Sequence, residues 1–248
     1  MPDHRPFDPN RRALIGAGAA WLAASTLPFP AFAQSSGAAK SRIGIIGSGR
    51  IGGTVGSLWV KAGHEVMFSS RHPEELKDLV AGLGPLAHAG TVAQAIAYAH
   101  TLFVAIPYGA LPQLGQDYGS QLKGKTVLDA GNASAGRDGA IADEVEKNGI
   151  GVTSQKYLPG SHLVRAFNTL SYMILAREAN RPPPRLAIPI AGDDPTAVKE
   201  AAQLVSDAGF DPVVVGGLAK ASLFQRGGPG YGQAVTAPEL RQILNLAP

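Results

Sequence analysis

Residues 43–56 read Ile-Gly-Ile-Ile-Gly-Ser-Gly-Arg-Ile-Gly-Gly-Thr-Val-Gly, a strand-length apolar run that leads into Gly47-x-Gly49-x-x-Gly52. This spacing is typical of a strand, a tight turn and a helix whose N-terminus holds a dinucleotide pyrophosphate. We expect Gly47 to allow the turn, Gly49 to let the backbone approach the phosphates, and Gly52 to let the helix pack closely on the strand. The other members of this predicted phosphate loop are Ser48, Arg50 and Ile51.

The end of the next predicted strand indicates which dinucleotide fits the loop. Residues 65–69 form that strand, and Ser69, Ser70 and Arg71 stand where an NAD-binding chain places a carboxylate for the ribose 2′-hydroxyl. A carboxylate would repel a 2′-phosphate, whereas hydroxyls and a guanidinium group bind one. Because the strand, the glycine turn, the helix and this polar, basic end agree, the sequence predicts an NADP site instead of a purely structural glycine turn.

Strands and helices alternate along the rest of the chain. The apolar runs of strand length are 42–46, 65–69, 101–106, 126–129, 162–167, 185–190 and 211–215. The helix-start signals are Thr91-x-x-Gln94, Asp194-Pro195 and Thr236-x-x-Glu239. The glycines expected to end helices are Gly63, Gly82, Gly149 and Gly209. This order predicts an α/β fold with a doubly wound, mainly parallel sheet, the Rossmann NAD(P)-binding fold, with a C-terminal α/β extension.

A ligand of such a sheet binds at the carboxyl ends of its strands, near the point where the strand order reverses. Four segments should therefore lie along one rim, namely 47–51, 69–71, 106–108 and 130–132. Their grouping follows from the topology alone. It is expected even where only some of these residues touch the ligand.

The N-terminus carries a different signal. Arg11 and Arg12 precede a run without charge from residue 13 to residue 39, and Ala-Phe-Ala at 31–33 resembles a small-x-small cleavage site. The pattern predicts a secretory signal peptide of the twin-arginine type, which exports folded proteins. The alternative is a membrane anchor, but the apolar stretch at 13–27 is shorter than the ~20 residues that cross a bilayer. We expect a periplasmic protein without stable membrane insertion after cleavage.

These signals divide the chain into four parts. They are a signal peptide (1–33), a linker (34–41), an NADP-binding Rossmann domain (42–153) and a C-terminal α/β portion (154–248) that completes the sheet and the acceptor cleft.

The composition narrows the function classes. The formal net charge is only +3, which gives no electrostatic case for nucleic acid or a membrane surface as partner. The chain has no cysteine, so disulfides and thiol catalysis are excluded, and its six histidines show no metal-ligand spacing. The expected partner is a small-molecule redox acceptor, no metal is expected, and a homodimer stays open.

Seven motifs in a fixed order carry a family resemblance. They are Gly47-Ser-Gly-Arg-Ile-Gly52, Ser69-Ser-Arg71, Val104-Ala-Ile-Pro-Tyr108, Asp129-Ala-Gly-Asn132 with Arg137-Asp138-Gly139, Val164-Arg-Ala-Phe-Asn-Thr169, Ala191-Gly-Asp-Asp-Pro195 and Asp207-Ala-Gly-Phe-Asp211. Together they resemble the NADP oxidoreductase family typified by deazaflavin (coenzyme F-420)-dependent NADP reductases. The resemblance covers roughly residues 42 to 226 and extends to the cytosolic domain of six-transmembrane metalloreductases.

The resemblance implies a role for several residues. NADP would lie on the glycine loop, with Ser70 and Arg71 at its 2′-phosphate. Ile106, Pro107 and Asn132 would border the nicotinamide. Asn168 stands where deazaflavin-reducing members tend to carry a histidine, so the resemblance does not fix the deazaflavin itself as the acceptor.

Each of the other polar residues near the predicted site has two possible roles. Tyr108 is either a proton donor near the nicotinamide or a loop aromatic that packs over the cofactor. Asn132 and Asn168 either hydrogen-bond a carboxamide or acceptor carbonyl, or cap turns. Arg137 and Asp138 line the pocket, or Asp138 caps a helix.

No residue pattern offers an acid and base pair for catalysis. Hydride transfer to a flavin-like ring needs mainly stacking and alignment, because the cofactors carry the chemistry. The sequence therefore predicts an NADP-dependent oxidoreductase that passes a hydride between NADPH and a flavin or deazaflavin. The alternative is a non-catalytic NADP-binding module, or a partner of a membrane redox protein of the metalloreductase kind.

Overall fold

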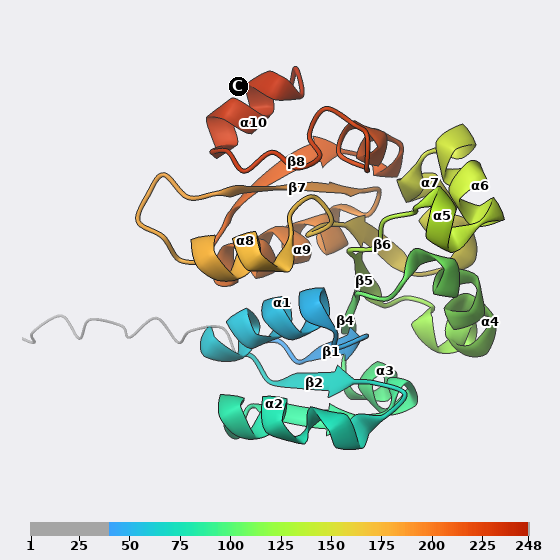
Figure 1. The fold of residues 1–248 in the computed structure, drawn as a ribbon, viewed down its shortest axis with the longest axis vertical. Helices are drawn as coiled ribbons and strands as arrows, with labels where there is room; N and C mark the ends of the chain where they lie inside the picture. Colours follow the sequence, from blue (N-terminus) through green and yellow to red (C-terminus); the bar gives the residue numbers. More distant parts are fainter. Residues whose placement is uncertain (1–39, 248) are drawn as a thin grey trace, which may run out of the picture. The chain divides into compact units, whose positions relative to one another are not determined.

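An eight-stranded sheet runs through the molecule in the order β3-β2-β1-β4-β5-β6-β7-β8 (Figure 1). The computed structural model describes residues 40–247, so the predicted signal peptide and most of the predicted linker lie outside the described residues. The strands are β1 Ile43–Ile46, β2 Val66–Ser69, β3 Ala87–Gly90, β4 Thr101–Val104, β5 Thr126–Asp129, β6 His162–Arg165, β7 Ala187–Gly192 and β8 Asp211–Gly216.

Helices connect and cover these strands. The α-helices are α1 Arg50–Lys61, α2 Lys77–Leu83, α3 Val92–Tyr98, α4 Leu111–Leu122, α5 Ala135–Asp138, α6 Ala140–Asn148, α7 Ile150–Tyr157, α8 Tyr172–Glu178, α9 Pro195–Asp207 and α10 Ala237–Ile243. The 3-10 turns are η2 Pro73–Leu76, η3 Tyr108–Ala110 and η4 Leu218–Leu223. Among the described residues, no helix is both long enough and apolar enough to cross a membrane.

The strand directions confirm the predicted doubly wound sheet. Strands β1 to β6 pair in parallel, β6 and β7 pair antiparallel, and β7 and β8 pair in parallel, so the last two strands run opposite to the first six. Strand β3 was not predicted. Its sequence Ala-His-Ala-Gly has no apolar run, and its place at the edge of the sheet leaves it only one neighbour.

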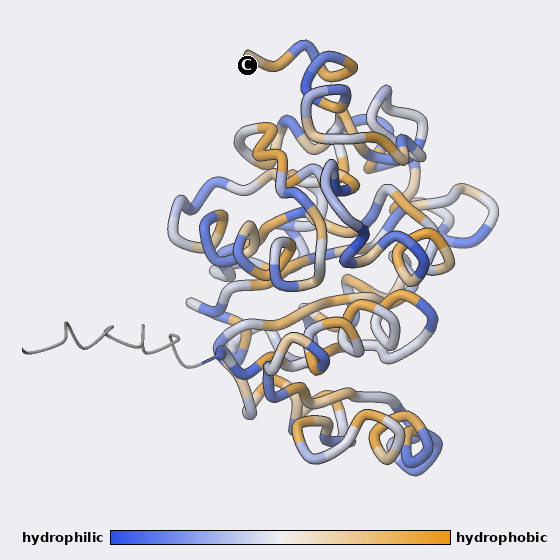
Figure 2. The backbone as a smooth tube through the Cα atoms, turned by 90° about the vertical axis from the view of Figure 1, so that its left-hand side faces the viewer, coloured by the Kyte–Doolittle hydropathy of each residue, from blue (hydrophilic) through white to orange (hydrophobic). Residues whose placement is uncertain are grey.

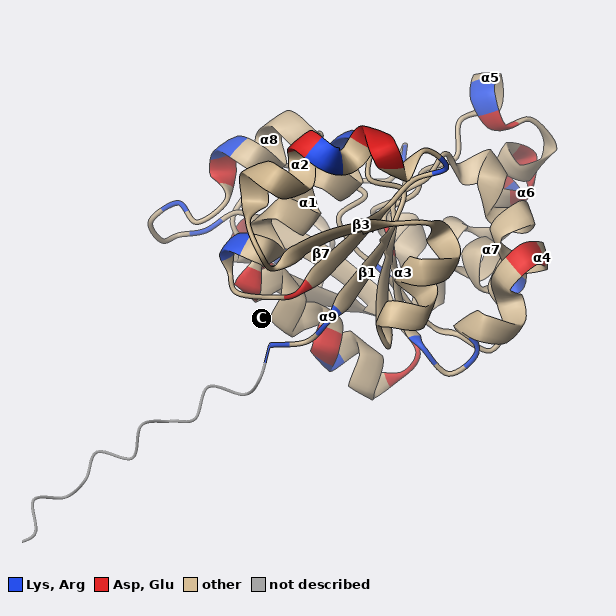
Figure 3. Cartoon of the chain, turned by 90° about the horizontal axis from the view of Figure 1, so that it is seen from below, with Lys and Arg blue, Asp and Glu red and all other residues tan. Residues whose placement is uncertain are grey.

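Two hydrophobic clusters sandwich the sheet, because successive strand residues point to opposite faces. In β4, Phe103 belongs to one cluster, whereas its neighbours Leu102 and Val104 belong to the other. The first cluster packs under α1, α8 and α9, and the second under α3, α4, α7 and α10. Apolar stretches accordingly run through the interior in Figure 2, and Figure 3 shows that charged residues concentrate on helices and loops.

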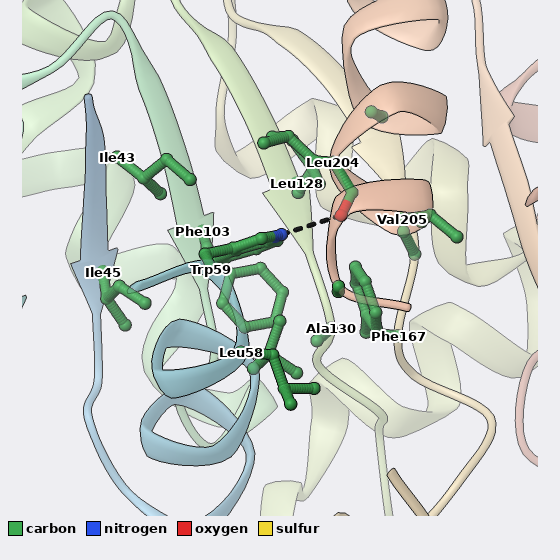
Figure 4. Packing of buried hydrophobic residues seen from close by; sticks show 14 of the residues in the cluster. Ile43, Ile45, Leu58, Trp59, Phe103, Leu128, Ala130, Phe167, Leu204 and Val205 are labelled. Carbon is green, nitrogen blue, oxygen red and sulfur yellow. Dashed lines mark hydrogen bonds between the residues drawn. The ribbon is translucent and has the colours of Figure 1, made fainter. Parts of the chain in front are cut away.

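Trp59 of α1 is the centre of the first cluster (Figure 4). Its ring meets Phe103 and Phe167 edge-on at centroid distances of 5.1 and 5.8 Å. Its indole N–H donates to the carbonyl oxygen of Leu204 in α9 at 2.8 Å. This bond ties the first helix of the Rossmann unit to the C-terminal part of the sheet, so the two predicted portions share one core.

The helix boundaries test the predicted caps. The capping boxes at Thr91 and Thr236 and the cap at Asp194 are confirmed. The predicted stop at Gly82 is wrong, because α2 continues to Leu83 and ends at Gly84, whose φ of +87° favours glycine.

Candidate dinucleotide and acceptor site

The three glycines of the loop after β1 stand in three different environments. Gly47 has a φ of +94°, and a Cβ there would lie 2.7 Å from the carbonyl oxygen of Ala105. A Cβ on Gly52 would collide with the carbonyl oxygen of Gly47. Around Gly49, in contrast, nothing lies within 4 Å of where a Cβ would stand. This is the pattern of a tight turn, a close helix contact and an open face that a pyrophosphate can approach.

The N-terminus of α1 provides the charge for that face. The helix begins after Gly49 without a side-chain cap, and its first turn contains no acidic residue. Its first backbone N–H groups therefore keep the partial positive charge of a free helix N-terminus, which favours a phosphate. The hydroxyl oxygen of Ser48 is buried and has no hydrogen-bond partner within residues 40–247. The loop thus fits a bound dinucleotide.

The residues at the end of β2 have two different roles: one side chain stabilises the sheet, and the next two are accessible to a ligand. The hydroxyl of Ser69 is fully buried and donates to the carbonyl oxygen of Ile45 at 2.5 Å, so it holds the two strands together. A direct contact from this side chain to the 2′-phosphate is therefore not supported. Ser70 is partly exposed, and its hydroxyl accepts from the backbone N–H of His72 at 3.1 Å. Arg71 is exposed and forms no ion pair within the described range 40–247.

The segment after β4 corrects the prediction for Tyr108. Ile106 is partly buried and Pro107 is exposed, as a cofactor edge requires, but Tyr108 turns inward and is 1% exposed. Its hydroxyl bonds with Ser154 at 2.9 Å and with the carbonyl oxygen of Ile150. Burial, together with the nearby charge of Asp129, raises the pKa of this hydroxyl above its usual value. Tyr108 is therefore neither a proton donor at the nicotinamide nor a cover for the cofactor.

Two asparagines meet where β5 and β6 end. The side-chain amide of Asn132 donates to the backbone oxygen of Asn168 at 2.6 Å, and that of Asn168 donates back to Asn132 Oδ1 at 3.3 Å. Asn168 is only 3% exposed, and its amide also donates to the carbonyl oxygen of Phe224 at 3.1 Å. The pair joins the predicted nicotinamide edge to residues 168–172, beside which the acceptor is predicted to bind and which we call the acceptor segment. The amide of Asn168 supports that segment, and its side-chain oxygen is buried without a hydrogen-bond partner within residues 40–247.

A buried ion pair lies beneath this edge. Asp129 and Arg165 are neighbours in the register of β5 and β6, both side chains are at most 1% exposed, and their charged groups are in contact. Asp129 Oδ1 accepts from the backbone N–H of Gly131 at 2.8 Å, and Arg165 donates to the carbonyl oxygen of the same glycine. Both backbone polar groups of Gly131 are therefore fixed, and with them the position of the next residue, Asn132.

This pair was missed by the sequence analysis, although an arginine inside an otherwise apolar strand was a visible signal. Burying two charges costs several kcal/mol, and removing one partner of such a pair typically costs about 3–5 kcal/mol. The pair thus holds the cofactor edge of the sheet rigidly, at a cost in the free energy of folding.

Arg137 and Asp138 fix the short helix α5, labelled in Figure 3, beside this edge. The carboxylate of Asp138 accepts from the backbone N–H groups of Gly109 and Ser134 at 3.0 and 2.8 Å. The Arg137 guanidinium beside it holds the pKa of Asp138 below its usual value. The predicted N-cap role for Asp138 is wrong, since Gly139 occupies that position in α6.

On the other side of the loop, α1 approaches α8. The guanidinium of Arg50 lies 5.4 Å from the ring centroid of Tyr172, the first residue of α8. The cation–π contact places the acceptor segment beside the phosphate loop. Among residues 40–247, no group of three or more metal-ligating side chains is present.

Comparison with known proteins agrees with this geometry. Residues 42–133, which include the glycine loop and Asn132, match the family described as NADP oxidoreductase, coenzyme F420-dependent. This segment is therefore similar to an NADP oxidoreductase domain. The match supports NADP(H) as the cofactor, and the proteins that this segment resembles are NADP-dependent oxidoreductases.

One relative and two solved structures are similar to more of the chain than residues 42–133. The chain is 29% identical over 191 residues to the metalloreductase STEAP3 of Rattus norvegicus, covering 73% of this chain and 35% of that one. It therefore spans only about a third of that relative. A hypothetical protein of Sinorhizobium meliloti, SMa0349, has a similar structure, with a TM-score of 0.67, 25% identity, and coverage of 79% and 95% of the two chains.

A second solved structure is a putative F420-dependent NADP reductase from Arthrobacter sp. FB24. Its TM-score is 0.62 at 22% identity, with 73% of this chain and 87% of that chain covered. At this identity the match shows the shared Rossmann-like fold.

Proposed function

We propose that this oxidoreductase transfers a hydride between NADPH and a flavin- or deazaflavin-like acceptor. The observation that carries the proposal is the set of polar side chains at the carboxyl ends of the parallel strands. Within the described residues, Tyr108 is buried, Asn132 and Asn168 are bonded to each other, the carboxylates of Asp129 and Asp138 are bound to arginines, and the ring of Tyr172 faces Arg50. A ketone or imine acceptor requires a proton donor beside the nicotinamide, whereas a conjugated ring takes its proton from water.

The residues of the chain would then bind and align the two rings. The open face at Gly49 and the N-terminus of α1 receive the pyrophosphate, and Arg71 and Ser70 recognise the 2′-phosphate. Gly131 and Asn132, fixed from below by the ion pair, set the edge against which the nicotinamide lies. When bound, the reduced nicotinamide supplies a hydride, which the acceptor ring takes up together with one proton from solvent.

Rapid-mixing absorbance at the nicotinamide band tests this proposal. We expect the protein to oxidise NADPH much faster with a flavin or a deazaflavin than with simple ketones or aldehydes. Faster turnover with the carbonyl compounds would contradict the proposal. If NADPH binds tightly and none of these compounds oxidises it, the non-catalytic NADP-binding module becomes the better account.

We also propose that the protein is exported folded to the periplasm by the twin-arginine route. Arg11, Arg12 and the small-x-small sequence at 31–33 support this. The double variant Arg11→Lys with Arg12→Lys is expected to keep the precursor in the cytoplasm, still able to bind NADP. Mature wild-type protein should begin near Gln34. Uncleaved protein that resists carbonate extraction from membranes would contradict cleavage and favour the anchor.

A further inference from the structure

A closed, glycine-rich loop lies beside the acceptor segment, at residues 225–231. The backbone N–H of Gly230 donates to the carbonyl oxygen of Leu223 at 2.9 Å, so the two ends of the loop meet. Inside it, Gly228 N–H donates to the oxygen of Gln225 at 2.8 Å, and Tyr231 N–H donates to the oxygen of Gly228 at 3.1 Å. The loop is therefore folded by its own backbone bonds.

Both ends of this loop are attached to the acceptor segment. At its start, the carbonyl oxygen of Phe224 accepts from the side-chain amide of Asn168 at 3.1 Å. At its end, the N–H of Gly232 donates to the carbonyl oxygen of Thr169 at 3.0 Å. Asn168 is in turn bonded to Asn132 at the predicted nicotinamide edge. The loop is thus placed on the acceptor side of the cofactor site, although it follows Asn168 by more than fifty residues.

The loop carries one charged side chain, Arg226. It is exposed, and its guanidinium lies 5.8 Å from the ring centroid of Tyr231, within the same loop. No carboxylate forms an ion pair with it within residues 40–247. Stacking on an aromatic ring orients a guanidinium and leaves its N–H groups free to bind a carboxylate or phosphate.

We propose that Arg226 is a specificity residue that binds an anionic group on the redox acceptor. The inference rests on the proposed function and deepens it, because it states the chemical class of the acceptor. The acceptor would be a conjugated ring whose side chain ends in a phosphate or a carboxylate. Tyr231 holds the guanidinium in place, and Asn168 and Thr169 hold the loop beside the ring.

The test compares two ligands that differ only in the anion. Riboflavin and flavin mononucleotide share one ring, and only the second carries a phosphate. Quenching of flavin fluorescence, measured with the protein–NADP⁺ complex, gives the Kd of each. We expect the wild type to bind the mononucleotide about tenfold or more tightly than riboflavin, as a charge-assisted hydrogen bond implies. Arg226→Ala is expected to remove most of that difference, and Arg226→Lys part of it.

Lys220→Ala is the matched control. It removes one positive charge from η4, in the same C-terminal segment, and is expected to leave the ratio of the two Kd values unchanged. Equal binding of both flavins by the wild type, no binding of either, or an unchanged ratio in Arg226→Ala would overturn the inference. Because the readout is binding, these outcomes are separate from a failure of the proposed function, which appears as absent NADPH oxidation.

Discussion

Gly49→Val is expected to abolish NADP binding and leave the fold intact. Gly49 has a φ of −74°, which a valine can adopt, and nothing lies within 4 Å of its Cβ position, so the free protein accommodates the side chain. The same open space is where the pyrophosphate must approach the backbone. The loss of two or more charge-assisted hydrogen bonds, at about 1.5–3 kcal/mol each, lowers the affinity by more than about a hundredfold. Titration calorimetry with NADP⁺ measures this loss.

The control for this variant is Gly119→Val. Gly119 lies in α4, and nothing lies within 4 Å of its Cβ position either. The control is expected to bind NADP⁺ like the wild type, and both variants should unfold cooperatively in a thermal scan. If Gly49→Val binds NADP⁺ with undiminished affinity, the dinucleotide does not use this loop.

Arg71→Ala is expected to weaken NADP⁺ binding roughly ten- to a hundredfold and leave NAD⁺ binding nearly unchanged. Arg71 is exposed at the end of β2, and its charge-assisted contact to the 2′-phosphate would contribute about 1.5–3 kcal/mol. NAD⁺ lacks that phosphate. The measurement is the pair of dissociation constants, determined at one salt concentration because exposed charges are screened.

Lys199→Ala serves as the control, since it removes an exposed positive charge from α9, on the C-terminal side of the sheet. It should leave both dissociation constants unchanged. Equal losses for both dinucleotides in Arg71→Ala would assign this arginine a structural role. A wild type that prefers NAD⁺ would overturn the NADP assignment.

The sequence alone was sufficient where the physics is local. A glycine that turns the chain or meets a helix, a proline at the first helical turn and a capping box act within a few residues, so their patterns predicted β1, α1 and the caps at Thr91, Asp194 and Thr236. The apolar runs predicted seven of the eight strands. Strand β3 was not predicted, because a short edge strand needs few apolar residues when its backbone pairs with the neighbouring strand β2.

Only the tertiary structure decided what each polar residue does at the site. Tyr108 follows β4 like a cofactor contact, yet its ring enters the core, because α7 supplies Ser154 and Ile150 as partners for its hydroxyl. Asp129 and Arg165 became a pair through strand register, which joins residues far apart in sequence. The loop that carries Arg226 lies beside Asn168 and Thr169 because Phe224 and Gly232, at its two ends, are bonded to them. These roles depend on which residues, distant in sequence, are close in space. The spacing of residues along the chain does not predict such contacts.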